Sequence, residues 1–488
     1  MTADLSGSVR RALFWRSGSQ IVSQIVSWGA TLAVVRILQP EDYGLFAMTQ
    51  VVLSFLSFLN GYGFASSLVK EKTLDHRAVR QGFGLLLMVN GALAVLQLLI
   101  APLVATYYRQ PLIADLLRVQ ALIYLTIPFI AIPEALMVRD LDFRRPAIAN
   151  FAASIAMAGT SLGCALAGLG VWTLVWAPLA MFWTRAAALV MQSHFRVVPS
   201  FDLRGAGGML NFGMLLLGSH FFWTVQTQAD IFIAGRSLDP HELGLYAEAL
   251  FLTMLVANKF VPPLNDVAFP AYARLQDDRA ALSAAFCKSV RLIMLVTMPL
   301  YLGLGVTAEP AVLTIFGEKW WAMAPMVAVI SLAMPAFTLH ILFAPAINAL
   351  GHARINLRTS ILGAVVMIAA FLVGVRYGAM GLAWAWVIAF PVMPLATFLQ
   401  ARHLLGVSAT DLARAILPAM GAAAAMAALV RFLAVGLETT PAWASLLAQA
   451  GFGGLAYAAI IFVFSRSTLN EMMALVIRRR PPPELAPA

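Results

Sequence analysis

The sequence predicts an all-α polytopic membrane protein, and three observations lead to this fold class. The chain has 488 residues, of which 61% are hydrophobic and only 11% charged, more apolar surface than a soluble chain of this size can bury. Apolar stretches of about 18 or more residues, the length a helix needs to cross a bilayer, recur from end to end. One phrase of the sequence also occurs twice, which predicts two related halves. The spans must be helices, because lipid offers no partner to an open backbone.

We predict fourteen membrane-spanning helices, separated by short polar turns or by prolines. We expect Pro128 and Pro133 to break the fourth, and the thirteenth is rich in alanine. The predicted spans are residues 17–38, 43–68, 82–106, 115–138, 147–168, 171–192, 209–234, 244–268, 285–308, 323–347, 356–375, 378–400, 412–435 and 443–464. No connection between them is long enough for a soluble domain. This argues against an enzyme that needs a nucleotide-binding fold.

Basic residues indicate how the chain is oriented. The net charge is +10, and most of the 33 Lys and Arg residues fall at the two termini or in every second loop. Cytoplasmic loops carry such an excess, so we expect both termini in the cytoplasm and need no nucleic-acid partner to explain the charge. Cys164 and Cys287 lie in or beside apolar spans, and we interpret them as small packing residues rather than as a disulfide.

The repeated phrase falls in two corresponding short turns. "RILQPEDYGLF" runs from Arg36 to Phe46, and "RSLDPHELGLY" from Arg236 to Tyr246. Six predicted spans, an even number, separate the copies, so both copies have the same orientation and form parallel repeats. We therefore predict two parallel six-helix lobes, residues 1–200 and 201–408, around a central cavity. Residues 409–488 add two transmembrane helices and a basic cytoplasmic tail. This is the architecture of a transporter that works by alternating access.

Three stretches carry a resemblance to a known family. They are "RILQPEDYGLFAMTQVVLSFLSFLNGYGFASSLVKEK" from Arg36, "EALMVRDLDFRR" from Glu134 and "LTIFGEKWWAMAP" from Leu313. Together they resemble polysaccharide-exporting members of the multidrug/oligosaccharidyl-lipid/polysaccharide (MOP) exporter superfamily, of the Wzx/WzxC-like flippase type. The likeness spans most of residues 10–400.

The resemblance implies a function and a location. It implies a flippase that moves an undecaprenyl-pyrophosphate-linked oligosaccharide across the bacterial inner membrane, for exopolysaccharide, capsule or O-antigen (lipopolysaccharide) biosynthesis. Polysaccharide polymerases and glycosyltransferases are the partners it implies. A lipid II flippase or a multidrug/cation antiporter of the same superfamily is the alternative within transport.

Charges inside predicted spans are candidate substrate contacts. A charge at mid-membrane costs about 2.5–3.5 kcal/mol on insertion scales, so it usually faces a cavity or a partner. Lys259 precedes Pro262 and Pro263, and its ammonium group is a compact cation that a diphosphate could bind. The alternatives are that the side chain extends toward the membrane surface or pairs with Asp266. Arg185 lies toward the expected cytoplasmic side, where snorkelling is also easier.

Polar stripes on two spans are further candidates for contacts with a sugar chain. Interhelical hydrogen bonding explains them equally well. The candidates are Arg16, Gln20 and Gln24 on the first span, and His220 and Gln226 on the seventh.

Two acids inside spans, Asp230 and Glu134, are candidates for coupling transport to Na⁺ or H⁺, although Asp230 has a possible partner in Arg236. We expect no other cofactor, since zinc spacing and a phosphate-binding loop are both absent from the sequence. "DLD" at Asp140–Asp142 has the form of a glycosyltransferase metal motif, but three residues without a sugar-nucleotide domain fit a helix end better.

Two readings outside transport are weaker. A membrane glycosyltransferase or polymerase predicts a large outer loop, and no predicted outer loop is long. An assembly scaffold would not require charges inside its spans.

The charge bias makes a topology prediction. A reporter fused after Arg480 is expected to be active in the cytoplasm, and one fused near Gly170 in the periplasm, as paired alkaline phosphatase and fluorescent protein fusions would show. Termini that report opposite sides would mean that the count of fourteen is wrong.

Overall fold

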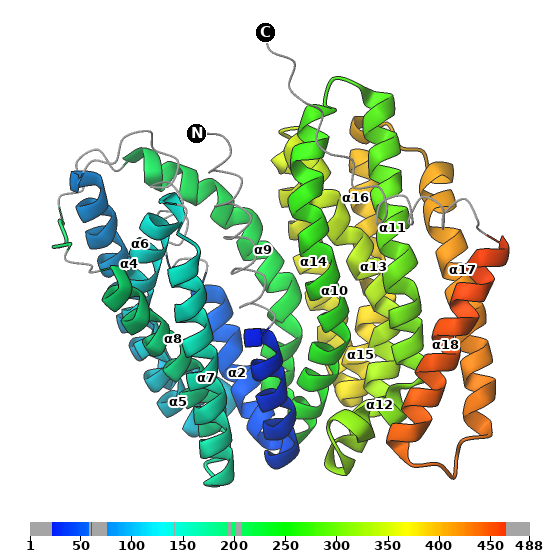
Figure 1. Cartoon of the computed structure of the whole chain (residues 1–488), viewed down its shortest axis with the longest axis horizontal. Helices are drawn as coiled ribbons and strands as arrows, with labels where there is room; N and C mark the ends of the chain where they lie inside the picture. Colours follow the sequence, from blue (N-terminus) through cyan, green and yellow to red (C-terminus); the bar gives the residue numbers. More distant parts are fainter. Residues whose placement is uncertain are drawn as a thin grey trace. The chain divides into compact units, whose positions relative to one another are not determined.

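The computed structural model describes residues 22–57, 60, 76–140, 142–193, 197–201 and 207–464. The side chains of residues 76, 78, 207–220 and 464 are outside this description. Every regular element in the described part is a helix, which confirms the all-α fold class (Figure 1). The chain forms two compact units, Met1–Ala247 and Glu248–Ala488, and the division falls inside one long helix, α10.

The first unit contains nine described helical segments and the beginning of α10. They are the first helix, of which Val22–Ile37 is described, α2 (Pro40–Ser57), α4 (His76–Tyr108), α5 (Leu112–Gln120), the 3-10 turn η1 (Ala121–Thr126), α6 (Ile127–Arg139), α7 (Arg144–Leu166), α8 (Trp172–Ser193), α9 (Gly207–Ser237) and α10 (Pro240–Arg274). Ile130 on α6, Ala149 on α7 and Leu189 on α8 are all fully buried in one cluster. This cluster holds three helices together next to the polar side chains described below.

The second unit contains the rest of α10 and ten further helical segments. They are α11 (Arg279–Val306), α12 (Ala308–Ile315), η2 (Glu318–Met323), α13 (Ala324–Ala349), α14 (Ala353–Gly374), η3 (Val375–Tyr377), α15 (Gly378–Ala389), α16 (Val392–Leu405), α17 (Ala409–Val435) and α18 (Ala442–Phe464). Its main core joins α11, α13, α16 and α17 through buried side chains such as Phe286, Phe343, Leu405 and Ala423. Ser408 and Asp411 form a capping box that starts α17.

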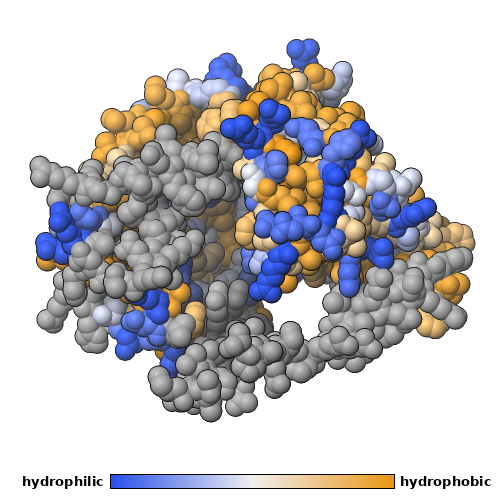
Figure 2. All heavy atoms as spheres, turned by 90° about the horizontal axis from the view of Figure 1, so that it is seen from above, coloured by the Kyte–Doolittle hydropathy of each residue, from blue (hydrophilic) through white to orange (hydrophobic). Residues whose placement is uncertain are grey.

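Each of the fourteen predicted spans overlaps a helix of the described chain, while residues 17–21 of the first span and most of residues 58–68 of the second lie outside the described residues. Ten helical stretches are long and apolar enough to cross a membrane, and one of them, Ala353–Leu405, contains two predicted spans. Many large apolar side chains on these helices are exposed, which is the pattern of a surface solvated by lipid. In the second unit, on the right of Figure 2, hydrophilic residues gather at one end of the helices and hydrophobic residues cover the flanks.

Prolines interrupt two of the predicted spans. The fourth consists of α5, η1 and α6, and the interruption comes just before Pro128, while Pro133 lies inside α6. The twelfth, predicted as 378–400, is divided into α15 and α16 at Phe390 and Pro391. The short segments α12 and η2, between the ninth and tenth spans, are the elements that hydropathy did not predict.

The two copies of the repeated phrase have the same local structure. In each copy a helix ends one residue before a leucine, Leu38 or Leu238, whose N–H still donates to the carbonyl four residues earlier. The next helix then begins at the proline, Pro40 or Pro240, where no intrahelical donor is needed. The turns are therefore structural equivalents, as the duplication predicts.

The two turns also contact each other within the first unit. A Cβ atom on Gly44 would clash with the carbonyl oxygen of Pro240, and one on Gly244 would clash with that of Pro40. This contact is reciprocal, as two copies related by a twofold axis require. Since the turns touch, they lie at the same end of their helices, which agrees with parallel rather than inverted repeats.

This contact makes a stability prediction. Gly44→Ala or Gly244→Ala is expected to destabilise the protein by about 1–3 kcal/mol, because the added methyl meets a backbone carbonyl that cannot rotate away. The matched control is Gly91→Ala on α4, where a Cβ atom meets no other atom within 4 Å. The control should be neutral or stabilising by about 0.5–1 kcal/mol, since glycine disfavours helix. Thermal unfolding in detergent measures both, and equal effects at Gly44 and Gly91 would contradict the contact.

Candidate functional site

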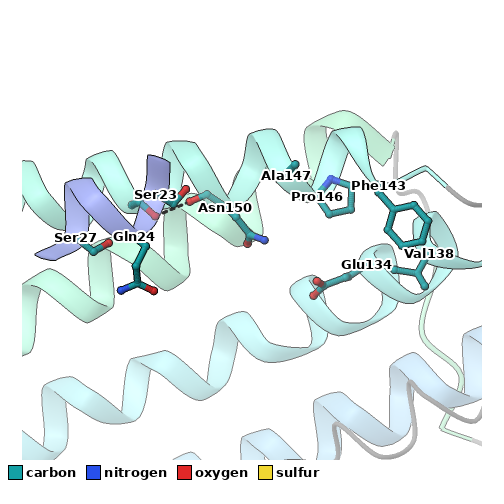
Figure 3. Close-up of a pocket in the computed structure, with 10 residues that line it drawn as sticks. Ser23, Gln24, Ser27, Glu134, Val138, Phe143, Pro146, Ala147 and Asn150 are labelled. Carbon is teal, nitrogen blue, oxygen red and sulfur yellow. Dashed lines mark hydrogen bonds between the residues drawn. The ribbon is translucent and has the colours of Figure 1, made fainter. Parts of the chain in front are cut away.

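A polar cavity of about 440 Å³ lies in the first unit, among helices that are otherwise apolar (Figure 3). Three of its polar side chains, Ser23, Gln24 and Ser27, come from the first helix. Glu134 comes from α6, and Asn150 and Ser154 from α7. These six polar side chains around one space can hydrogen-bond a hydroxyl-rich ligand. Of the sequence candidates, the cavity brings together Gln24 and Glu134.

Glu134 forms an ion pair with Arg185 of α8. One terminal nitrogen of the guanidinium lies 2.9 Å from Oε1 and 2.8 Å from Oε2 of the carboxylate. The side chains are 28% and 24% exposed, so most of each charge is removed from solvent. Pairing lets both charges stay inside apolar helices, because either charge alone would carry the whole desolvation cost. The pair joins the substrate candidate Arg185 to the ion-coupling candidate Glu134, a combination that the sequence did not predict.

The pair leaves part of Arg185 unsatisfied. Its Nε atom is buried and has no hydrogen-bond partner in the described part of the chain. A guanidinium has five N–H groups, so it can hold Glu134 and still donate to another acceptor. Arg185 is therefore neutralised in charge but retains capacity to bind an oxygen-rich group.

A second polar cluster lies on α9, where two buried polar residues are one helical turn apart. Gln226 and Asp230 are both 0% exposed, four positions apart and hence on one face. Tyr246 of α10 donates its hydroxyl hydrogen to Asp230 Oδ2 at 2.7 Å. Neither the nitrogen nor the oxygen of the Gln226 amide has a hydrogen-bond partner among the described residues. A buried amide without partners is costly and marks a place where a polar ligand or ion gains most by binding.

Arg236 does not pair with Asp230, the alternative that the sequence left open. Its Nη1 donates instead to the backbone oxygen of Tyr107, and its guanidinium carbon lies 5.4 Å from the centre of that ring. The Tyr107 ring also stacks on Phe232, with ring centres 4.6 Å apart. These contacts hold the C-terminal end of α9 against the C-terminal end of α4, next to the two repeated turns.

Lys259 lies on the exposed surface of α10, on the part that belongs to the second unit. The helix continues through Pro262, Pro263 and Pro270 as one element to Arg274. The structure therefore places a cation on an intact proline-rich helix rather than at a break in one. Arg16 and Gln20 lie outside the described residues, as does the side chain of His220.

Sequence reasoning missed the small polar residues of the cavity. Ser23 and Ser27 are four residues apart on the first helix, as are Asn150 and Ser154 on α7. This i, i+4 spacing puts each pair on one helix face, so it was a usable signal. Serine hydroxyls in helices often donate to the carbonyl four residues earlier, as Ser154 does to Asn150. Because such serines are common, their spacing alone did not single out a cavity.

The "DLD" motif has a structural role at a helix start. Asp142 Oδ1 accepts hydrogen bonds from the backbone N–H groups of Arg144 and Arg145, which open α7. The carboxylate also pairs with the Arg145 side chain at 3.2 Å. Capping explains this acid without a metal.

Comparisons of sequence point to polysaccharide biosynthesis. A family model described as "Polysaccharide biosynthesis protein" matches residues 33–325. The succinoglycan biosynthesis transport protein ExoT of Rhizobium meliloti is 24% identical over 476 residues, which cover 95% of each chain. The lipopolysaccharide biosynthesis protein WzxC of Escherichia coli is 24% identical over 299 residues, or 60% of each chain.

Comparison of structures shows which fold the chain shares with solved proteins. The lipid II flippase MurJ in an inward closed conformation superposes with a TM-score of 0.75. The match covers 93% of this chain and 99% of MurJ at 12% sequence identity, so it shows a shared fold. The family match confirms the predicted resemblance to polysaccharide-exporting proteins, and the shared fold agrees with it.

The Glu134–Arg185 pair makes a prediction about stability. A double-mutant cycle with Glu134→Gln and Arg185→Met is expected to give a coupling free energy of about 1–3 kcal/mol, because each single change leaves a mostly buried charge unpaired. The double variant should be more stable than the worse single variant. Unfolding in detergent measures all three.

The control cycle uses Asp115 and Arg118, an ion pair in which both side chains are more than half exposed. Water screens this pair, so its coupling should be about 0.2–1 kcal/mol or less. A coupling at Glu134–Arg185 no larger than the control would contradict the stabilising role.

Proposed function

The chain belongs to the family of polysaccharide biosynthesis proteins, and from this premise we propose that it flips an undecaprenyl-pyrophosphate-linked oligosaccharide across the bacterial inner membrane. The family match over residues 33–325 is the observation that carries the proposal. The chain has the fold of a MOP-type transporter and is a multi-pass membrane protein. The fold alone does not choose the cargo, since MurJ, named for lipid II, shares it. The sequence relatives named for succinoglycan and lipopolysaccharide favour an oligosaccharide.

Transport by alternating access requires contacts that close one side and can separate. The reciprocal contact of Gly44 and Gly244 with the opposite prolines is suited to this role. So is the stack of Tyr107 on Phe232 beside it. Both join segments of different repeats at what the charge bias predicts to be the outer end. Opening toward the periplasm would separate these surfaces.

The polar cavity is suited to the sugar part of the cargo. Gln24, Asn150 and Ser27 offer neutral donors and acceptors that match sugar hydroxyls. Arg185 stays held by Glu134, so it contributes hydrogen bonds more than net charge. Arg16, Gln20, His220 and Gln226 extend the proposed set of substrate contacts along the first and seventh spans.

Lys259 is proposed to meet the diphosphate. It provides an ammonium group on α10, within one or two turns of Pro262 and Pro263, which leave neighbouring backbone carbonyls without donors. The diphosphate needs such a charge because it must leave water to cross the bilayer.

Asp230 is proposed as the site of coupling to Na⁺ or H⁺, ahead of Glu134. The Glu134 carboxylate already neutralises Arg185, whereas Asp230 is fully buried and is held by a neutral tyrosine hydroxyl. A proton or Na⁺ would neutralise Asp230 and could also reach the amide oxygen of Gln226 one turn away. Polymerases and glycosyltransferases are the proposed partners, and the protein acts as a transporter rather than an enzyme.

Substitution of Lys259 tests the proposed substrate contact. Lys259→Ala is expected to reduce polysaccharide export at least about tenfold, and Lys259→Arg to retain part of it, because arginine keeps the charge and changes the geometry. The measurement is surface polysaccharide in a deletion strain complemented with each variant, with the membrane level of the protein quantified alongside.

The matched control is Lys288→Ala, which removes another exposed lysine near the start of α11. Export should be normal in this variant. Full export by Lys259→Ala would refute the diphosphate contact, and normal polysaccharide in the deletion strain itself would refute the flippase.

A further inference from the structure

A polar pocket of about 500 Å³ lies in the second unit, apart from every candidate substrate residue. It is formed where α12 meets α18 and where α17 turns into α18. In Figure 1, α12 and the α17–α18 turn lie at the same end of this unit. The helices α17 and α18 are outside the duplicated part of the chain, so the repeat does not explain why this pocket is polar.

A buried amide belongs to the wall of this pocket. Gln449 lines it and is only 3% exposed. Its Nε2 donates to Ser445 Oγ at 2.8 Å, which fixes the orientation of the amide. Its Oε1 is buried without a hydrogen-bond partner among the described residues. The wall of the pocket therefore contains an acceptor that lacks a donor among the described residues, and the Ser445 hydroxyl retains a hydrogen to donate.

The charged side chains of the pocket are two acids and one base. No described residue forms an ion pair or hydrogen bond with the side chains of Arg431 and Glu438. Among the described residues, Glu309 accepts one hydrogen bond, from Trp321 Nε1 at 3.2 Å. Two carboxylates and an orphan carbonyl favour a cationic N–H donor, and the single guanidinium favours an anion next to it.

The surroundings indicate that the ligand comes from the membrane. Phe432 on α17 and Trp443 and Leu447 on α18 are exposed, so apolar surface continues from the pocket along both helices. Trp321 donates to the lining residue Glu309, and Trp443 follows the lining residue Ala442; both rings are exposed, as interfacial aromatic residues are at the level of lipid headgroups. A ligand with a zwitterionic head and acyl chains fits both the charges and this surface.

We propose that this pocket binds the headgroup of an aminophospholipid of the phosphatidylethanolamine class. The ammonium donates to Glu309, Glu438 and Gln449 Oε1, and the phosphate accepts from Arg431 and Ser445. A neutral sugar would leave both acids and the arginine without charged partners, and an anionic headgroup would meet two carboxylates. The site is independent of the proposed transport function, because it uses none of the residues assigned to the cargo.

The test is native mass spectrometry of the delipidated full-length protein with phosphatidylethanolamine and phosphatidylcholine of identical acyl chains. The wild type is expected to bind phosphatidylethanolamine about tenfold more tightly, because the choline nitrogen has no N–H to donate. Glu438→Gln and Gln449→Leu should each remove most of this preference without weakening phosphatidylcholine. Arg431→Ala should weaken both lipids alike, since both carry the phosphate.

The control is Arg376→Ala, which removes another exposed arginine, on η3, outside the pocket. It should bind both lipids like the wild type. Equal binding of the two lipids by the wild type would overturn the proposal, as would a preference that survives Glu438→Gln and Gln449→Leu combined. Displacement of phosphatidylethanolamine by inorganic phosphate would assign the pocket to a free anion instead. Thermal unfolding of each variant separates lost binding from lost folding, and Glu438 lies on an exposed turn where glutamine is tolerated.

Discussion

The reciprocal contact between the turn at Pro40–Gly44 and the turn at Pro240–Gly244 is the constraint on which the first unit depends. Each glycine lies against the carbonyl of the opposite proline, at a separation that no side chain fits. Two turns can approach so closely only because each has a glycine at the contact, and the sequence duplication provides a glycine in both. The contact brings α9 and the start of α10, from the second repeat, into one compact unit with the helices of the first.

Polar side chains inside apolar helices are the second organising feature. Every such group must find a partner, because lipid and packed apolar side chains offer none. Glu134 and Arg185 satisfy each other, and Tyr246 satisfies one oxygen of Asp230. Gln226 and Gln449 keep atoms that no described residue satisfies. The contrast separates polar groups that stabilise the fold from those that remain available to a ligand.

The distribution of polar groups fits the cargo of a lipid-linked oligosaccharide transporter. Such a cargo has hydroxyl groups, a diphosphate and a long apolar chain. The first unit supplies a cavity lined by serines, an asparagine and a glutamine. Helix α10 supplies a lysine, and the flanks of the helices supply apolar surface. Polysaccharide biosynthesis follows from the family, whereas the route of each part of the cargo is the proposal that the mutants address.

The sequence by itself determined the all-α membrane fold and the approximate positions of the helices, since a long run of apolar residues is most stable as a helix that crosses the bilayer. It also determined the repeat, because equivalent turns need the same proline and glycine. It identified Glu134, Arg185, Gln226 and Asp230 as unusual, each being polar in an apolar span. Only the tertiary structure decided their partners: Arg185 and Glu134 are 51 positions apart, and Asp230 meets Tyr246 rather than Arg236. Hydropathy is a local property of the chain, whereas pairing depends on which helix faces come together, and packing alone sets that.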